Sequence, residues 1–186
     1  MPAIPALTEP LSDGHIQLRA ASGRDIPEIL IAYEDDPQLH VRLGEDRPPS
    51  GAQLGTRAER AAAELAAGSC ARLTILEPGS EDCCGQLTLR TIDWDHLRAE
   101  LQLWVAPQLR RRGLARRALR LPAPWLFNDC GLMRITLLIE PDNEPMLRAA
   151  RAAGFVEEGV LRGYTRERGT RVDRAVLSLL PEDVRR

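Results

Sequence analysis

One segment constrains the fold more than any other, and it reads LWVAPQLRRRGLAR over residues 103–116. An apolar strand ends at Val105, Pro107 stops it, and an arginine-rich loop leads into a helix that begins at about Leu114. The first N–H groups of a helix have no partner inside it, and the helix dipole adds partial positive charge there. Gly113 and Ala115 leave the backbone open to close approach, and the arginines offer charge-assisted bonds. The segment therefore predicts a phosphate-binding loop.

The competing interpretation of this segment is an arginine-rich helix start that is merely solvated. A nucleotide P-loop is excluded, because the GxxxxGK[ST] pattern is missing and all 25 basic residues are arginine. A dinucleotide-binding fold is disfavoured, because no GxGxxG follows a strand. The ligand is thus expected to carry phosphate without being identified by these residues alone.

The rest of the chain predicts one α/β domain with the element order β-α-α-β-β-β-α-β-α-β-β. We expect a loose N-terminal segment at residues 1–13, the domain at 14–181 and a short tail at 182–186. Pro122 and Pro124 predict a break or kink near Arg120. The expected strands cover residues 16–19, 71–76, 85–92, 99–105, 133–139, 155–160 and 175–180, and the expected helices cover 24–33, 56–67, a stretch from 114, and 144–153.

Composition limits the class of protein. The chain has 186 residues, of which 44% are hydrophobic and 28% charged, as in an ordinary globular domain. The net charge of −2 gives no general attraction to nucleic acid or anionic membranes, and no run of about 18 apolar residues predicts a span. Without a secretory signal pattern, a cytoplasmic protein is expected. The four cysteines and three histidines lack metal-ligand spacing, so no metal site is expected.

Several motifs together carry a resemblance to a known family. RxxGxA at residues 110–115, after VxP at 105–107, resembles the pyrophosphate loop of the GNAT N-acetyltransferases. Asn143, GF at 154–155 and EGxLR at 158–162 are similar to the RimJ/RimL-like branch. The resemblance implies a single GNAT domain with a central mixed, mostly antiparallel sheet and flanking helices. Its strands at 99–105 and 133–139 would splay apart to admit acetyl-CoA.

The resemblance also implies a division of labour around acetyl-CoA, the acyl donor. The backbone of residues 103–105 would pair with the pantetheine arm like an added strand, and an N–H near Val105 would stabilise the oxyanion. The backbone of residues 111–116 would hold the pyrophosphate. Asn143 would contact the cofactor near its thiol, and it is equally suited to capping the helix that follows. The cofactor-binding residues expected are Leu103, Trp104, Val105, Arg110, Arg111, Arg112, Gly113, Leu114, Ala115, Arg116 and Asn143.

The sequence identifies fewer candidates for the catalytic residues than for cofactor binding. Glu100 is the candidate base, because several similar enzymes carry a glutamate at this point of the strand. The tyrosine and serine that similar proteins use as acids are replaced here by Ala150 and Met146. Tyr164 is the substitute candidate, and solvent is the alternative proton source.

The expected reaction is direct acetyl transfer to a primary amine in a ternary complex, the amine being a protein N-terminus, an amino acid or a small amine. The first alternative is a catalytically degenerate module that binds CoA or acyl-CoA. The second is a nucleic-acid-binding protein using the arginines between Arg110 and Arg120, which the overall acidity opposes. Similar proteins are commonly dimers, so a homodimer is expected.

Overall fold

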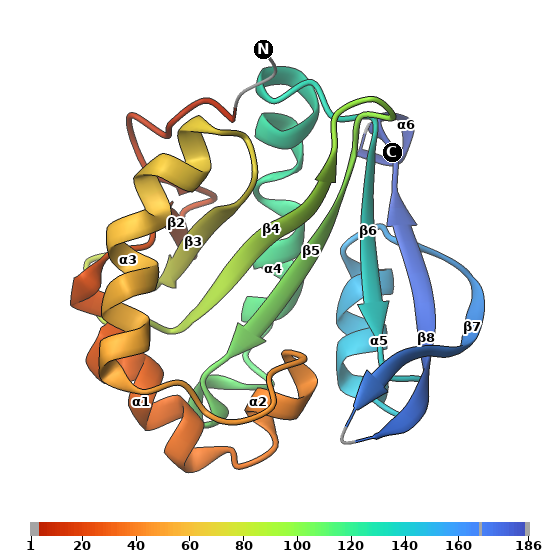
Figure 1. The fold of residues 1–186 in the computed structure, drawn as a ribbon. Coiled ribbons are helices and arrows are strands. Elements are labelled where there is room, and N and C mark those ends of the chain that lie inside the picture. Colours follow the sequence, from red (N-terminus) through yellow and green to blue (C-terminus); the bar gives the residue numbers. More distant parts are fainter. Residues whose placement is uncertain (1–3, 168, 185–186) are drawn as a thin grey trace.

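The structure is a computed structural model that describes residues 4–167 and 169–184. Its strands form one eight-stranded sheet in the order β1-β2-β3-β4-β5-β6-β8-β7 (Figure 1). Within these residues β5 and β6 are the one parallel pair, which confirms the predicted mixed, mostly antiparallel sheet. The strands are β1 (Leu11–Ser12), β2 (Gln17–Ala20), β3 (Ala71–Leu76), β4 (Gly85–Asp93), β5 (Arg98–Val105), β6 (Arg134–Ile139), β7 (Val156–Glu167) and β8 (Thr170–Leu179).

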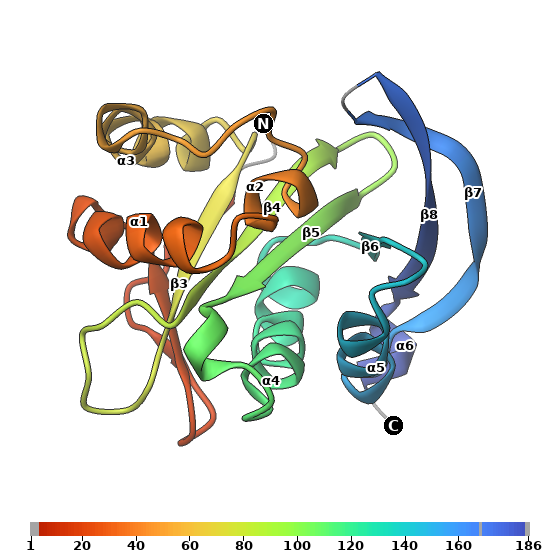
Figure 2. The same ribbon diagram turned by 90° about the horizontal axis from the view of Figure 1, so that it is seen from below.

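Helices cover both faces of the sheet (Figure 2). On one face lie α1 (Ile26–Asp35), α2 (Leu39–Arg42) and α3 (Gly51–Ala66), and on the other lie α4 (Leu114–Arg120) and α5 (Glu144–Ala152). Successive side chains of β5 point alternately to these two faces of the sheet. Leu101 and Val105 join the larger core, whereas Trp104 joins a second core with Tyr33 and Leu39.

Local signals explain where several helices begin. Ser50 caps α3 in a capping box with Gln53, and Asn143 caps α5 through the backbone N–H of Met146. Ser22 caps the short 3₁₀ turn η1 (Gly23–Asp25), whose Asp25 is buried. Asp25 accepts hydrogen bonds from Arg19 and from the Thr74 hydroxyl, and so ties the start of α1 to β2 and β3.

The chain start and several boundaries differ from expectation. Part of the expected loose segment makes ordered contacts: Ile4 is buried in the core and β1 pairs with β2, while residues 1–3 lie outside the described part. The short helices α2 and α6 (Pro181–Val184) were not predicted, and β7 extends well beyond residue 160. These features depend on packing between distant segments, which leaves little local signal.

The proline pair acts as predicted. The α-helix α4 ends at Arg120, and a π-helical turn η3 (Trp125–Asp129) follows. Pro122 and Pro124 have no N–H to donate, so the ladder of helical hydrogen bonds is interrupted there and resumes where the Leu126 N–H donates to the Pro122 carbonyl. None of the helices in the described residues is both long and apolar enough to span a bilayer.

Candidate active site

The strands β5 and β6 separate along their length. They pair from Arg98 with Arg134 as far as Leu101 with Leu137, and the pairing ends there. Figure 1 shows the two strands diverging toward their carboxyl ends, and we call this opening the splay. Residues 102–105 remain paired with β4 on their other edge. The backbone N–H and C=O groups facing the splay therefore form an open strand edge, which suits an extended ligand with amide groups.

The loop after β5 reaches the helix in an unusual conformation. It passes through a 3₁₀ turn η2 (Pro107–Leu109), after which Arg111 has a φ of 65° and Gly113 a φ of 81°. Gly113 occupies the N-cap position of α4 and provides no side-chain acceptor. Leu114 is buried and anchors the helix start. The N–H groups of the first turn therefore stay open to a ligand, and the space beside Gly113 is clear of heavy atoms within 4 Å of an added Cβ.

The guanidinium groups of the loop are partly engaged by the protein itself. Arg110 donates from Nε to the Val105 carbonyl at 3.1 Å and from Nη2 to Asp36 Oδ2 at 2.6 Å. Arg112 pairs with Glu77 at 2.6 Å. Within the described residues, Arg111 and Arg116 are exposed and form no ion pair, so their guanidinium groups are open to solvent. Arg110 and Arg112 therefore have carboxylate partners within the protein, and their contact with a cofactor stays a prediction.

Asp36 connects the loop to the helices on the opposite face. It lies directly after α1, is largely buried, and also pairs with Arg42 at 2.9 Å. Burial alone would raise the pKa of its carboxyl group, but the hydrogen bond from Arg110 and the charge of Arg42 outweigh burial and lower it. The end of β5 and the α1–α2 junction are thus held together by one ionised carboxylate.

Replacing Asp36 with Asn should lower the free energy of unfolding by about 1–2 kcal/mol at neutral pH, because one charged partner is lost and Arg110 is partly exposed. The folded-state pKa of Asp36 is lowered, so its contribution is fully present above the unfolded-state pKa of about 3.9 and fades as the pH falls below it. Urea denaturation of both proteins between about pH 3 and pH 7 measures this. If the difference in free energy of unfolding between wild type and Asp36→Asn does not shrink as the pH falls, the ion-pair role of Asp36 is contradicted.

Glu100 lies on the face of β5 toward α1–α3, one residue before the splay opens. It is opposite Thr136 on β6 and opposite Arg90 on β4. Its Oε2 accepts a hydrogen bond from Thr91 Oγ1 at 3.2 Å and lies 3.7 Å from Arg90 Nε. Thr91 has a φ of 51° at a register shift in β4, so a bulge directs its hydroxyl toward the carboxylate. With its side chain 20% exposed, Glu100 is accessible to a proton donor.

Asn143 has the capping role that the sequence suggested. Its Oδ1 accepts from the Met146 N–H at 3.3 Å, and its Nδ2 donates to Glu140 Oε2 at 3.4 Å. Glu140 in turn pairs with the buried Arg174 of β8 at 3.0 Å. The contact of Asn143 with a cofactor stays a prediction.

Tyr164 lies on β7 between the pairs Leu161–Arg174 and Thr165–Val172, where the register shifts. Its side chain is 53% exposed, and its hydroxyl has no hydrogen bond to the described residues. Figure 2 shows the carboxyl end of β7 on the same side of the sheet as α2. The structure gives no contact between Tyr164 and Glu100, so its role as an acid stays a prediction.

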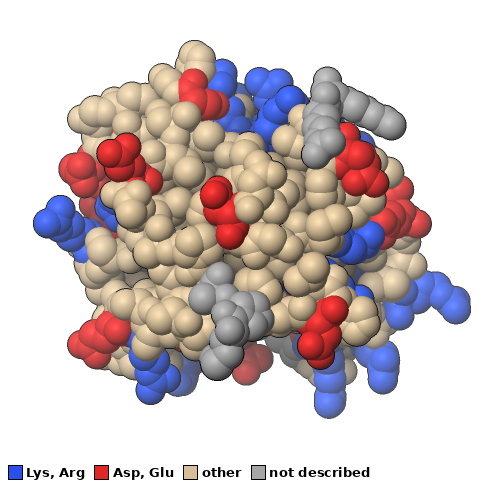
Figure 3. All heavy atoms as spheres, turned by 90° about the horizontal axis from the view of Figure 1, so that it is seen from above, with Lys and Arg blue, Asp and Glu red and all other residues tan. Residues whose placement is uncertain are grey.

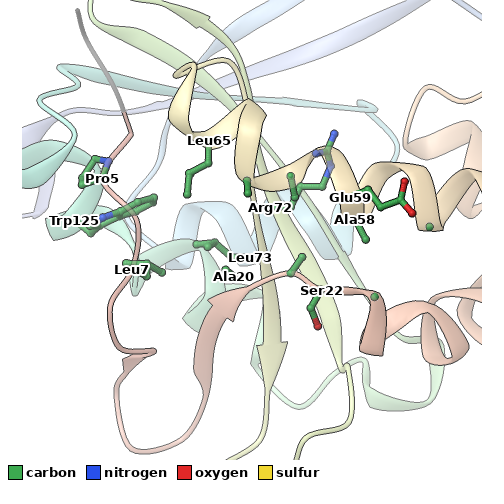
Figure 4. A pocket seen from close by; sticks show the side chains of 15 residues that line it. Pro5, Leu7, Ala20, Ser22, Ala58, Glu59, Leu65, Arg72, Leu73 and Trp125 are labelled. Atoms are coloured by element: carbon green, nitrogen blue, oxygen red, sulfur yellow. The ribbon is translucent and has the colours of Figure 1, made fainter.

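One cavity of the structure lies away from these residues. It measures about 540 Å³ and is bounded by α3, the chain start and Trp125 (Figure 4). Its walls are mostly apolar, with Leu7, Leu65 and Leu73 among them, and no predicted site residue lines it. We therefore place the candidate site at the splay. Groups of His, Cys, Asp or Glu that could hold a metal are absent from the described residues.

Sequence reasoning missed two contributors to the site. Asp36, which holds Arg110, follows a helix far from the loop in sequence and carries no motif. Arg90, beside Glu100, lies on the neighbouring strand. Strand alternation could have placed Arg90 on the same face as Glu100 if the β4–β5 register had been known.

Comparison with known proteins agrees with this arrangement. A family model described as "Acetyltransferase (GNAT) domain" matches residues 15–156. The chain is 26% identical over 170 residues to a Bacillus subtilis protein named "Uncharacterized N-acetyltransferase YoaA", covering 91% of this chain and 96% of YoaA. It is 27% identical over 116 residues to a Bacillus licheniformis protein named "Uncharacterized N-acetyltransferase p20", covering 62% of this chain and 65% of p20.

A solved structure has the same fold. Mycobacterium smegmatis RimJ in complex with CoA-disulfide matches with a TM-score of 0.81 and 24% identity, covering 96% of this chain and 88% of RimJ. At this identity the likeness concerns the fold, whereas the family model covers most of the chain. The chain therefore belongs to the GNAT acetyltransferase family.

Proposed function

We propose that the protein transfers an acetyl group from acetyl-CoA to a primary amine by direct attack in a ternary complex. The observation that carries the proposal is the open edge of β5, which lies between an uncapped helix start and the carboxylate of Glu100. The names of the relatives YoaA and p20 support a nitrogen acceptor. The acceptor amine belongs to a protein N-terminus, an amino acid or a small amine.

The residues at the splay fit the parts of acetyl-CoA. Amide groups of an extended pantetheine arm match the backbone groups of Leu103, Trp104 and Val105. The pyrophosphate matches the N–H groups at Gly113–Arg116 and the exposed guanidinium groups of Arg111 and Arg116. Acetyl-CoA supplies the activated acyl thioester, and the binding of CoA-disulfide by RimJ supports this fit.

The protein's own residues would then manage protons and charge. Glu100 takes a proton from the acceptor ammonium, directly or through water, because an ammonium group cannot attack a thioester. The Thr91 hydroxyl and Arg90 keep the Glu100 carboxylate oriented. An N–H near Val105 stabilises negative charge that develops on the acyl oxygen. The C–S bond of the thioester then breaks, and the departing CoA thiolate takes a proton from Tyr164 or from solvent.

Direct transfer is supported by the state of the thiols. Burial raises the pKa of Cys83 to about 12 and that of Cys130 to about 12. Burial also raises the pKa of Cys70 and of Cys84. The thiolate is the nucleophilic form, so these cysteines are poorly suited to carrying the acyl group.

A CoA-binding module without turnover is the second candidate, and one observation favours it. Met146 and the fully buried Ala150 stand on α5 where similar proteins carry a proton donor, and neither can protonate a departing thiolate. Release of free CoA thiol that depends on an added amine distinguishes the enzyme from the module.

The remaining expectations belong to the same proposal: a domain at residues 14–181, a cytoplasmic location, a homodimer, and no nucleic-acid or membrane partner. The face seen from above has acidic and basic side chains interspersed around its rim (Figure 3). This distribution, with a net charge of −2, supports the absence of nucleic-acid binding.

Replacing Gly113 with Glu should weaken acetyl-CoA binding at least tenfold, because a carboxylate would stand where the pyrophosphate approaches. Isothermal titration of wild type and variant with acetyl-CoA measures the effect. Gly131→Glu is the matched control, because Gly131 also has a positive φ (73°), is exposed, and has clear space around an added Cβ.

The control variant should bind acetyl-CoA like the wild type. Equal weakening in both variants would point to general destabilisation rather than to the loop. A folded wild type that does not bind acetyl-CoA would overturn both the enzyme and the CoA-binding alternative.

A further inference from the structure

A second cavity adjoins the splay on the side of α1–α3. It measures about 350 Å³, and its floor includes Gln102 and Trp104, which belong to the end of β5 that does not pair with β6. Residues of α1, the segment after α2, and α3 form its other walls. A molecule held there would lie beside the open edge of β5, on the face that carries Glu100. We call it the arginine cavity because Arg57, Arg72 and Arg90 line it.

Carboxylates are scarce in the lining of the arginine cavity. Among the described residues that line the cavity, Glu45 is the one acidic side chain, and both of its oxygens are engaged. Its Oε1 pairs with Arg57 at 2.8 Å, and its Oε2 accepts from the Tyr33 hydroxyl at 2.7 Å. The cavity thus offers little to a polycation and has no vacant carboxylate for a second ammonium group.

The three arginines differ in how tightly they are held. Arg57 has its close partner in Glu45, and Arg72 pairs closely with Glu64 of α3. Arg90 makes the longest contacts: its Nε is 3.7 Å from Glu100 Oε2, and its Nη1 is 3.4 Å from Gln102 Oε1. Its side chain is 46% exposed. Most of the donor capacity of Arg90 is therefore available, at the position across the strand pair from Glu100.

We propose that the acceptor amine carries an anionic group, a carboxylate or a phosphate, and that Arg90 binds this group in the arginine cavity. The inference rests on the proposed function. A guanidinium fork binds such planar or tetrahedral oxyanions through paired hydrogen bonds. With the anion on Arg90, an amine a few bonds away lies near Glu100 and the splay. The preferred substrates are then amino acids or phosphorylated amines, and polyamines are poor ones.

The experiment measures kcat/KM with acetyl-CoA for matched substrates on the full chain. An α-amino acid is compared with its carboxamide, phosphoethanolamine is compared with ethanolamine, and spermidine serves as the polycation. We expect wild type to prefer the anionic member of at least one pair by about 10- to 100-fold, as for a hydrogen-bonded charge. Which pair shows the preference distinguishes carboxylate from phosphate.

Arg90→Gln should reduce that preference ratio by about 10-fold or more. The measured quantity is the ratio of kcat/KM between the two substrates of a pair, not either rate alone. Arg90 also contacts Glu100, and a misoriented Glu100 would slow the reaction of both substrates equally. Arg60→Gln, an exposed arginine of α3 that does not line the cavity, is the matched control and should keep the ratio.

Three results would overturn the inference. The first is wild-type activity on the amide, ethanolamine or spermidine that equals or exceeds activity on the anionic substrates, which would leave the acetyltransferase proposal standing. The second is an equal loss on both members of a pair in Arg90→Gln, which would make Arg90 a positioning residue for Glu100. The third is acetylation of no amine at all by a protein that binds acetyl-CoA, which would remove the proposed reaction and this inference together.

Discussion

Glu100→Gln is expected to lower kcat for amine acetylation by about 10²- to 10⁴-fold at neutral pH, without changing the affinity for acetyl-CoA. The amide keeps the size of the side chain and still accepts a hydrogen bond from Thr91, but it cannot take a proton. Steady-state kinetics with a thiol reagent, together with titration of acetyl-CoA, separates the two effects.

The pH dependence of kcat provides a second test of the role of Glu100. As the pH approaches the pKa of the acceptor amine, more of the amine is already neutral and needs no base. The gap between wild type and Glu100→Gln should therefore narrow at high pH. Glu59→Gln, an exposed carboxylate on α3, is the control and should show neither effect. A loss that does not change with pH would assign Glu100 to holding Arg90 and Thr91.

Local patterns predicted the parts of the site that depend on one stretch of chain. The alternation through Ala99–Val105 placed Glu100 opposite Leu101 and Leu103, as the structure has it. Asn143 with Pro145 in the first turn predicted the start of α5. The break after Arg120 followed from the absence of N–H groups on two prolines. In each case the cause lies within a few residues of the effect.

The parts that escaped prediction depend on contacts between distant segments. Arg110 pairs with Asp36, which lies 74 residues earlier in the chain. Ile4 and β1 gain order from burial against the core and from pairing with β2, not from local propensity. The arginine cavity needs α1, α3 and β3–β5 at once. The hydrophobic periodicity of the sequence does not reveal such contacts, because strand register and helix packing depend on the whole fold.

Gly85 lies so close to the backbone of β5 that the structure leaves no room for a side chain. Its replacement by Ala should therefore destabilise the protein more than Asp36→Asn does. It is the first residue of β4 and pairs with Val105 at the end of β5. A Cβ built on Gly85 would lie 2.2 Å from the Trp104 carbonyl oxygen and 2.9 Å from the Val105 Cα. Both are backbone atoms, so no side chain can turn aside to relieve the clash.

Gly85→Ala is therefore expected to lower the free energy of unfolding by roughly 2–4 kcal/mol, since overpacking costs about 1–3 kcal/mol and the positive φ adds about 1 kcal/mol. Urea denaturation measures it, with Gly79→Ala as the control, because Gly79 has a φ of 79° but open space around its Cβ. The control should cost only about 1 kcal/mol.

The same change should reach the site through β5. Relief of the clash requires β4 to move away from Trp104 and Val105, which shifts the strand edge that faces the splay. Variant protein that remains folded should thus bind acetyl-CoA more weakly than Gly79→Ala does. Equal stability and equal affinity in the two variants would mean that β4 does not press on the end of β5, and that the open edge is positioned by the Arg110–Asp36 pair instead.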